Sequence, residues 1–301
     1  MKLPASSSPV DAARAIIARG VYGRIGAPGR VQQALREPAG DPGLFGPDSM
    51  VWRVHADLPS MLIGGISALM LQTLHPLAMA GVDQHSNFRE DAFGRLRNTS
   101  EFIALTSFGS RAGAEEAISR VRRVHRRVRG EADDGRHYAA GDPALLTWVH
   151  VALSWSFLHS YQAYAGSPLT ASESDRYYYE ISIVAYKLGA QDVPRSAAEV
   201  AAYVEEVRPE LKATPAGLEA VAFLMKPPDQ TAAEKLLYPV LAQACLQLLP
   251  QWAQAELGMK AVAPLQAGAV RKAAGAIGTL MRWGVGTPMS VRWAAERVAE
   301  A

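Results

Sequence analysis

Residues 143–166 read PALLTWVHVALSWSFLHSYQAYAG, a segment without Asp, Glu, Lys or Arg that is apolar on nearly every side. Asp142 followed by Pro143 supplies the N-cap and the first-turn proline that commonly start a helix. A helix that is hydrophobic all round is buried among other elements. We therefore expect a long buried helix over this segment.

Helical periodicity also covers most of the remaining chain. Apolar residues recur at three- and four-residue spacings, whereas the alternating patterns typical of strands are scarce. The segments with helical spacing are 12–18, 93–108, 114–128, 144–164, 172–188, 197–207, 216–225, 232–257 and 270–283. The sequence therefore predicts an all-α fold.

Signals for helix ends agree with these segments. Thr170 and Glu173 form a capping box, and Pro239 is expected to kink or split the helix over 232–257. Glycines stand where helix C-caps are expected, namely Gly109, Gly130, Gly166 and Gly189. No repeat and no Gly/Ser linker divides the chain. We expect an N-terminal arm over 1–47, one helical domain over 48–263, and a C-terminal helical tail over 264–301 that packs on it.

The composition excludes several classes of protein. With 301 residues, 49% of them apolar and 20% charged, the chain is globular rather than disordered or collagenous. A net charge of +2 and a pI of about 8.6 are too mild to indicate a nucleic-acid partner. Cys245 is the only cysteine, which excludes an intrachain disulfide, and the N-terminus lacks the apolar core of a signal peptide. We expect a reducing, cytoplasmic location.

Residues 58–82 form an uncharged stretch of 25 residues, longer than the ~20 needed to cross a bilayer. Gly64, Gly65, Gln72, His75 and Pro76 interrupt it, and its cleanly apolar part covers only 61–71. That length is typical of a buried core helix, which is the interpretation we favour. Membrane contact through 58–82 is the alternative.

The helix over 114–130 carries a histidine among six arginines. Ile118, Val121, His125 and Val128 share one face, so His125 is expected to face the core while the arginines point elsewhere. A buried imidazole needs a hydrogen-bond partner or a metal, because leaving it bare costs on the order of 1–3 kcal/mol. A haem iron would satisfy it. A neighbouring carbonyl is the alternative partner.

The helix over 93–109 places Arg95 and Thr99 on one face, next to Phe102 and Ile103. A permanent cation and a hydroxyl beside an apolar surface suit a carboxylate such as a porphyrin propionate, or the polarisation of bound oxygen. The alternative is an arginine that reaches water and a threonine bonded to its own backbone.

Histidines on other segments are further candidates. His150 and Ser154 lie one turn apart on the apolar helix over 144–164 and suit a distal pocket, and His75 follows the uncharged stretch. Trp148, Trp155 and Phe157 could wall a flat ligand, although aromatic residues at helical spacing are usually ordinary core.

Other catalytic motifs are absent from the sequence. There is no His-Glu-x-x-His, Glu-x-x-His pair, P-loop or Gly-x-Ser-x-Gly. His55 and Asp57 have the His-x-Asp spacing of a non-haem iron triad, but that triad needs a third histidine and usually a β-barrel, which we do not predict.

Five segments, in this order along the chain, resemble the family of mpaB-type and rubber (latex-clearing) oxygenases. They are LMLQTLHPLAMAGVDQHS at 69–86, GRLRNTSEF at 94–102, RRVHRRVRG at 122–130, DGRHYAAGDPALLTWVHVAL at 134–153 and SESDRYYYEISIVAYKLG at 172–189. The resemblance extends over about 51–227. It implies an all-α, globin-like haem b protein, which in the latex-clearing branch cleaves carbon–carbon double bonds with dioxygen.

The resemblance also implies roles for particular residues. The family's proximal haem ligand lies in Arg-x-x-His, matched by Arg122 and His125, and its Arg-x-x-x-Thr segment near the haem is matched by Arg95 and Thr99. Latex-clearing enzymes have a lysine just before that threonine, where this chain has Asn98. A distal group must then come from elsewhere.

We accordingly expect a haem b oxygenase or peroxidase-like enzyme that oxidises a hydrophobic small molecule with dioxygen or peroxide. His125 would bind the iron, Arg122 would orient that ligand or meet a propionate, and Arg95 and Thr99 would contact the haem edge. His150 would lie on the other haem face as second ligand or acid, with His75 nearby. The alternatives are a non-catalytic haem sensor or carrier, and a cofactor-free protein that binds lipids or isoprenoids.

Overall fold

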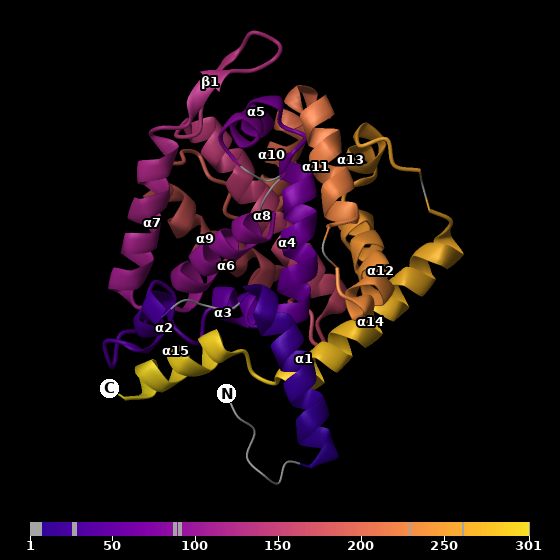
Figure 1. Cartoon of the computed structure of the whole chain (residues 1–301). Coiled ribbons are helices and arrows are strands. Elements are labelled where there is room, and N and C mark those ends of the chain that lie inside the picture. The colour runs from indigo at the N-terminus through magenta and orange to yellow at the C-terminus, as the bar shows by residue number, and fades with distance from the viewer. Residues whose placement is uncertain are drawn as a thin grey trace.

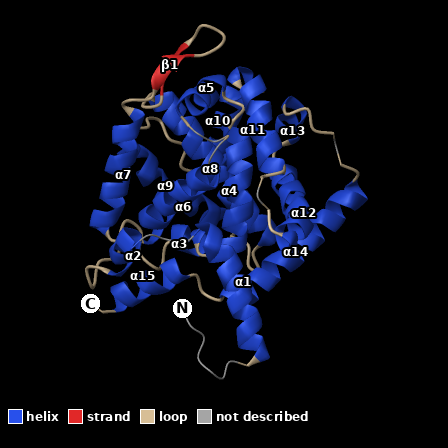
Figure 2. Cartoon of the chain, in the orientation of Figure 1, coloured by secondary structure: helices blue, strands red, loops and turns tan. Residues whose placement is uncertain are grey.

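The computed structural model describes residues 8–25, 29–86, 89, 92–228, 230–260 and 262–300, and for residues 24, 25 and 92–96 it describes the backbone alone. The all-α prediction is confirmed. The described chain is built from α-helices, with one short two-stranded hairpin at one end (Figure 2).

The helices differ widely in length. In chain order they are α1 (Pro9–Ile25), α2 (Gly29–Arg36), α3 (Met50–His55), α4 (Leu58–Gln72), α5 (Pro76–His85), α6 (Ala92–Phe108), α7 (Arg111–His125), α8 (Pro143–Tyr164), α9 (Ala171–Leu188), α10 (Ala197–Val207), α11 (Pro215–Met225), α12 (Ala232–Leu248), α13 (Gln251–Glu256), α14 (Pro264–Val285) and α15 (Met289–Ala299). The hairpin consists of β1 (Arg129–Glu131) and β2 (His137–Ala139), and a 3-10 turn covers Arg208–Glu210.

The pairing of α4 with α8 is the most extensive helix contact in the described chain, and the two helices lie at its centre (Figure 1). Gly64 brings the backbones close together, since a Cβ at this position would lie 2.9 Å from the carbonyl oxygen of Ser156 and 3.0 Å from Cα of Phe157. The uncharged stretch 58–82 thus begins with a core helix. The other helices surround this pair.

Several helix ends agree with the sequence signals. The Asp142 carboxylate accepts a hydrogen bond from the Ala144 N–H at 2.8 Å, which caps α8. Thr170 and Glu173 form a complete capping box at the start of α9, and Gly189 ends that helix with a φ of 111°. These caps depend on residues adjacent in sequence, which explains why the sequence predicts them.

One predicted helix end is wrong, and one expected break lies elsewhere. The arginine-rich helix α7 ends at His125 and not at Gly130, because Gly130 pairs with Tyr138 in the hairpin. The segment over 232–257 is split, but at Pro250 rather than at Pro239: α12 continues through Pro239 to Leu248, and α13 begins at Gln251. At Gly130 the pairing of the two strands overrides the local helical signal.

The uncharged stretch 58–82 raises the alternative of membrane contact, which the lengths of the helices address in part. Within the described residues, no single helix is long and apolar enough to cross a bilayer. The pair α4 and α5 meets that test together, by length and composition alone, but the two helices are bent by 104° at the break between them.

The two ends of the chain pack against the helical core and against each other. Helix α1 contacts α14, and α2 contacts α15, so that the first two helices lie beside the last two (Figure 1). Arg297 of α15 is 1% exposed and donates hydrogen bonds to the carbonyl oxygens of Ala34, Leu35 and Asp41. This buried guanidinium joins the C-terminal helix to the end of α2 and to the segment that follows it.

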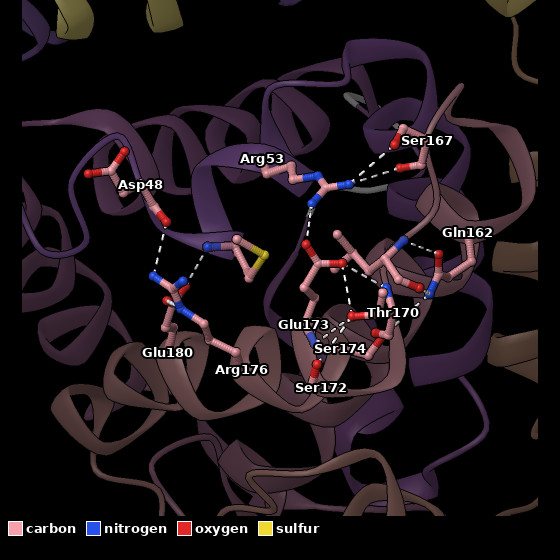
Figure 3. A network of polar contacts seen from close by, with 12 residues as sticks. Asp48, Arg53, Gln162, Ser167, Thr170, Ser172, Glu173, Ser174, Arg176 and Glu180 are labelled. Atoms are coloured by element: carbon pink, nitrogen blue, oxygen red, sulfur yellow. Dashed lines mark hydrogen bonds and ion pairs between the residues drawn. The ribbon is translucent and has the colours of Figure 1, made fainter.

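A polar network holds α3 against α9 (Figure 3). The Glu180 carboxylate accepts hydrogen bonds from the N–H groups of Met50 and Val51 at 2.7 and 3.2 Å, which satisfies the N-terminus of α3. Arg53 forms an ion pair with Glu173 at 2.6 Å. The network fixes the position of His55, the last residue of α3.

The close approach of α4 and α8 can be tested with two neighbouring glycines. Gly64→Ala should lower the free energy of unfolding by about 1–2 kcal/mol, because its methyl group would overlap the α8 backbone. Gly65→Ala is the matched control: its nearest contact would be a Phe157 ring carbon at 3.7 Å, so the better helix propensity should add roughly 0.5–1 kcal/mol. Urea unfolding followed by circular dichroism measures both values, and equal effects of the two variants would contradict the packing.

Candidate functional site

A cavity of about 420 Å³ lies beside the α4–α8 pair. It is lined by residues from α3 to α9, the hairpin and α11, and most of these residues are apolar, among them Leu69, Leu77, Val149, Leu153 and Phe223. A pocket of this size with apolar walls and a few polar groups is typical of a small-molecule site. Four histidines also line it: His55, His85, His125 and His150.

His125 reaches the cavity from the last turn of α7. Its half-buried ring lines the wall together with Val128, which the helical spacing places on the same face, and with Val124, which that spacing does not. Its Nδ1 atom is buried and has no hydrogen-bond partner in the described chain. Burial lowers the pKa of this imidazole below its ordinary value. The ring is therefore neutral near pH 7, which is the form that binds a metal.

His150 reaches the same cavity from α8, so two successive helices each bring an imidazole to one cavity wall. Its side chain makes no hydrogen bond to any described residue, and burial lowers its pKa to about 4. The alternative is that His125 forms a hydrogen bond to a neighbouring carbonyl. Among the described atoms, the buried Nδ1 of His125 has no such bond.

Four hydroxyl groups on the cavity wall are used in hydrogen bonds within the protein. Thr73, Thr106 and Ser154 each donate to a carbonyl oxygen of the preceding helical turn, at 2.7, 2.8 and 2.9 Å. The Tyr138 hydroxyl donates to Oε1 of Gln84 at 2.7 Å. Because these donors are already used, the wall is more apolar than its residue types suggest, and the imidazoles and the Gln72 side chain are among its remaining polar groups.

His55 lines the inner wall and forms a buried hydrogen-bonded triad. Its Nδ1 lies 2.6 Å from Oγ of Ser107 on α6, and its Nε2 lies 3.1 Å from the hydroxyl of Tyr177 on α9. All three side chains are less than 10% exposed, and burial lowers the pKa of His55 to about 3. Sequence reasoning missed this triad, because its members lie on three helices and share no local pattern.

The His-x-Asp pattern does not form a metal site. His55 is bound in the triad, while Asp57 caps α4 and forms an ion pair with Arg282 at 2.7 Å. No group of three or more His, Cys, Asp and Glu residues that could hold a metal ion occurs among the described residues.

Other candidate residues lie in various places. His75 is 4% exposed but lines a separate polar cleft, where its Nε2 is 4.0 Å from Glu210. Leu77, Tyr138 and Leu145 line both this cleft and the cavity. Because α5 turns away from α4 at this point, His75 belongs to the cleft.

Arg122 and Thr99, two of the residues from the sequence prediction, do not line the cavity. Arg122 is exposed at the end of α7, and Thr99 is half-buried on α6. The Arg95 side chain lies outside the described residues. Of the three aromatic residues expected to wall a flat ligand, Phe157 lines the cavity, Trp148 is core, and Trp155 stacks on His159.

The triad predicts how stability depends on pH. Because the pKa of His55 is about 3 in the folded protein and about 6.5 in the unfolded chain, the unfolded state takes up the proton first. The contribution of the neutral, buried His55 to the free energy of unfolding is complete above pH 6.5. This contribution is lost as the pH falls toward 3, at roughly 1.4 kcal/mol per pH unit.

Urea unfolding at several pH values tests this dependence. His55→Gln should show a shallower loss of stability than the wild type between neutral and acidic pH. His137→Gln is the control, because the side chain of His137 is 86% exposed, and its slope should equal that of the wild type. A wild-type slope in His55→Gln would show that His55 does not titrate in this way.

Comparison with known proteins agrees with the motifs. The sequence model of the family described as ER-bound oxygenase mpaB/B'/Rubber oxygenase, catalytic domain, matches residues 52–283, which is more than half of the chain. No curated protein and no solved structure matches the chain. The match includes the helices that surround the cavity, from α3 to α11. The chain therefore belongs to the mpaB/rubber oxygenase catalytic-domain family, whose members are oxygenases.

Proposed function

We propose that the chain is a haem b-dependent oxygenase that acts on a hydrophobic small molecule, with His125 as the iron ligand. The observation that carries the proposal is that two neutral imidazoles, His125 and His150, line one apolar cavity, and that neither side chain has a hydrogen bond to any described residue. Family membership supports the oxygenase activity.

The donor set fits haem better than a bare metal ion. A haem supplies four of the iron's ligands itself, so one or two imidazoles from the protein complete the coordination. The unpartnered nitrogen of His125 is a buried polar atom whose partner the described chain does not supply, and its cost is on the order of 1–3 kcal/mol. Ligation would orient this ring and remove part of that cost.

The residues of the cavity have distinct parts in such a reaction. Bound haem supplies the redox chemistry with dioxygen or peroxide, while the protein controls access, polarity and orientation. Leucines and Phe157 exclude water and hold an apolar substrate against the wall. His150, neutral near pH 7, can hold or donate a proton at its ring nitrogen, since no hydrogen bond to the described chain occupies it.

Residues implied by the family resemblance complete the proposal. Arg95 and Thr99 would contact the haem edge or bound oxygen from α6, and Arg122 would orient His125 or meet a propionate. His75 would act from the neighbouring cleft, behind Leu77 and Tyr138. These assignments rest on the matched motifs.

A second candidate function is a haem sensor or carrier without turnover. The presence of His125 and His150 on one cavity favours it, because if both imidazoles were to hold the iron of a bound haem, no iron position would be left for oxygen. The third candidate function is the binding of lipids or isoprenoids in the same apolar space by a cofactor-free protein.

Substitution of the proposed ligand tests the first function. His125→Ala should lose stoichiometric haem, measured from the Soret band and by metal analysis, while its helical circular dichroism stays near that of the wild type. Ser119→Ala, on the same helix but outside the cavity lining, is the control and should keep its haem. Full haem content in His125→Ala would make His150 the ligand, and a wild type that binds no added haem would favour the lipid-binding function.

The absorption spectrum separates the enzyme from the carrier. An oxygenase with His125 as its single axial ligand should bind carbon monoxide when reduced, because one iron position is open. A low-spin ferric spectrum and no carbon monoxide binding would indicate ligation by both histidines. His150→Ala should then restore carbon monoxide binding.

A further inference from the structure

Arginines gather at the C-terminal end of α7 and just beyond it. Arg123, Arg126 and Arg127 are all exposed there, and we call them the arginine surface. Helix α7 lies along one side of the molecule, with the β1–β2 hairpin beyond its C-terminal end (Figure 1). A basic residue in the last turn of a helix interacts favourably with the helix dipole, but of these three only Arg123 belongs to that turn, so the dipole does not account for the group.

Their charge is not compensated by carboxylates of the described chain. Arg123 donates to the hydroxyl of Ser119 at 2.9 Å, and no member of the arginine surface forms an ion pair with a described residue. The acidic residues of α7 lie toward its other end, where Glu115 pairs with Lys187 and Glu116 pairs with Arg120. The arginine surface therefore has a local positive potential, although the whole chain has a net charge of only +2.

The arginine surface lies next to the place where the cavity reaches the exterior. Val124, between Arg123 and His125, lines the cavity and is nevertheless 54% exposed. The exposed His85, at the end of α5, lines the cavity as well. An apolar cavity thus opens beside exposed arginines and one exposed valine.

We propose that the arginine surface docks the mouth of this cavity on an anionic lipid bilayer. Each arginine near such a surface contributes about 1 kcal/mol of attraction, and an exposed apolar side chain can enter the headgroup region. Hydrophobic molecules concentrate in bilayers, so a docked mouth would receive them without passage through water. The proposal concerns the protein surface and holds whether or not the cavity contains haem.

Vesicle co-sedimentation tests the proposal with purified full-length protein. The wild type should bind vesicles in which roughly a third of the lipid is phosphatidylglycerol. It should bind far less to vesicles of phosphatidylcholine alone. The triple variant Arg123→Gln/Arg126→Gln/Arg127→Gln should bind the anionic vesicles roughly 100-fold more weakly, since three arginines are removed at about 1 kcal/mol each. Added salt should weaken wild-type binding.

A matched variant keeps the test specific. Arg19→Gln/Lys235→Gln/Lys272→Gln removes the same charge from exposed positions on α1, α12 and α14 and should bind like the wild type. Circular dichroism confirms that both variants are folded. Equal losses in the two variants, equal binding to neutral and anionic vesicles, or no binding by the wild type would each overturn the proposal.

Discussion

The close packing of α4 against α8 is the constraint on which the rest of the molecule depends. Both helices are apolar over most of their surface, so neither is stable in water without the other. Gly64 lets the two backbones approach, and each helix then contributes residues to the wall of the cavity. The position of the cavity therefore follows from the packing of the core, because the burial of apolar surface that stabilises the fold also places the cavity walls.

Two buried or half-buried histidines in this apolar interior differ in whether their ring nitrogens have hydrogen-bond partners. Around His55 every ring nitrogen has a buried hydroxyl partner, which makes the triad a structural link between α3, α6 and α9. Nδ1 of His125 has no such partner, and among the nine buried side-chain atoms of the described residues that lack one it is the only one whose residue lines the cavity. Its place on the cavity wall is therefore the reason to propose ligand binding for His125 and packing for His55.

The cavity and the outer surface lead to related conclusions by independent routes. Inward-facing residues of α7 line an apolar space with a neutral imidazole, while its outward-facing arginines carry uncompensated charge. Because the chain belongs to an oxygenase family, the apolar space beside the inner face of α7 is the candidate site of an oxidation. The arginines on the outer face offer a route by which a poorly soluble substrate could reach that space from a bilayer. One helix thus links the proposed reaction to the proposed surface.

The amino-acid pattern alone determined the helical class, the capped ends of α8 and α9, and the inward direction of His125, because each depends on residues a few positions apart. It did not determine which histidines share a cavity. His125 and His150 line one cavity because separate helices pack around it, whereas the bend before α5 takes His75 into another cleft. The end of α7 was likewise decided by strand pairing at Gly130. Spacing along one helix sets the direction of a side chain, but distances between helices arise from contacts across the whole core, which only the tertiary structure contains.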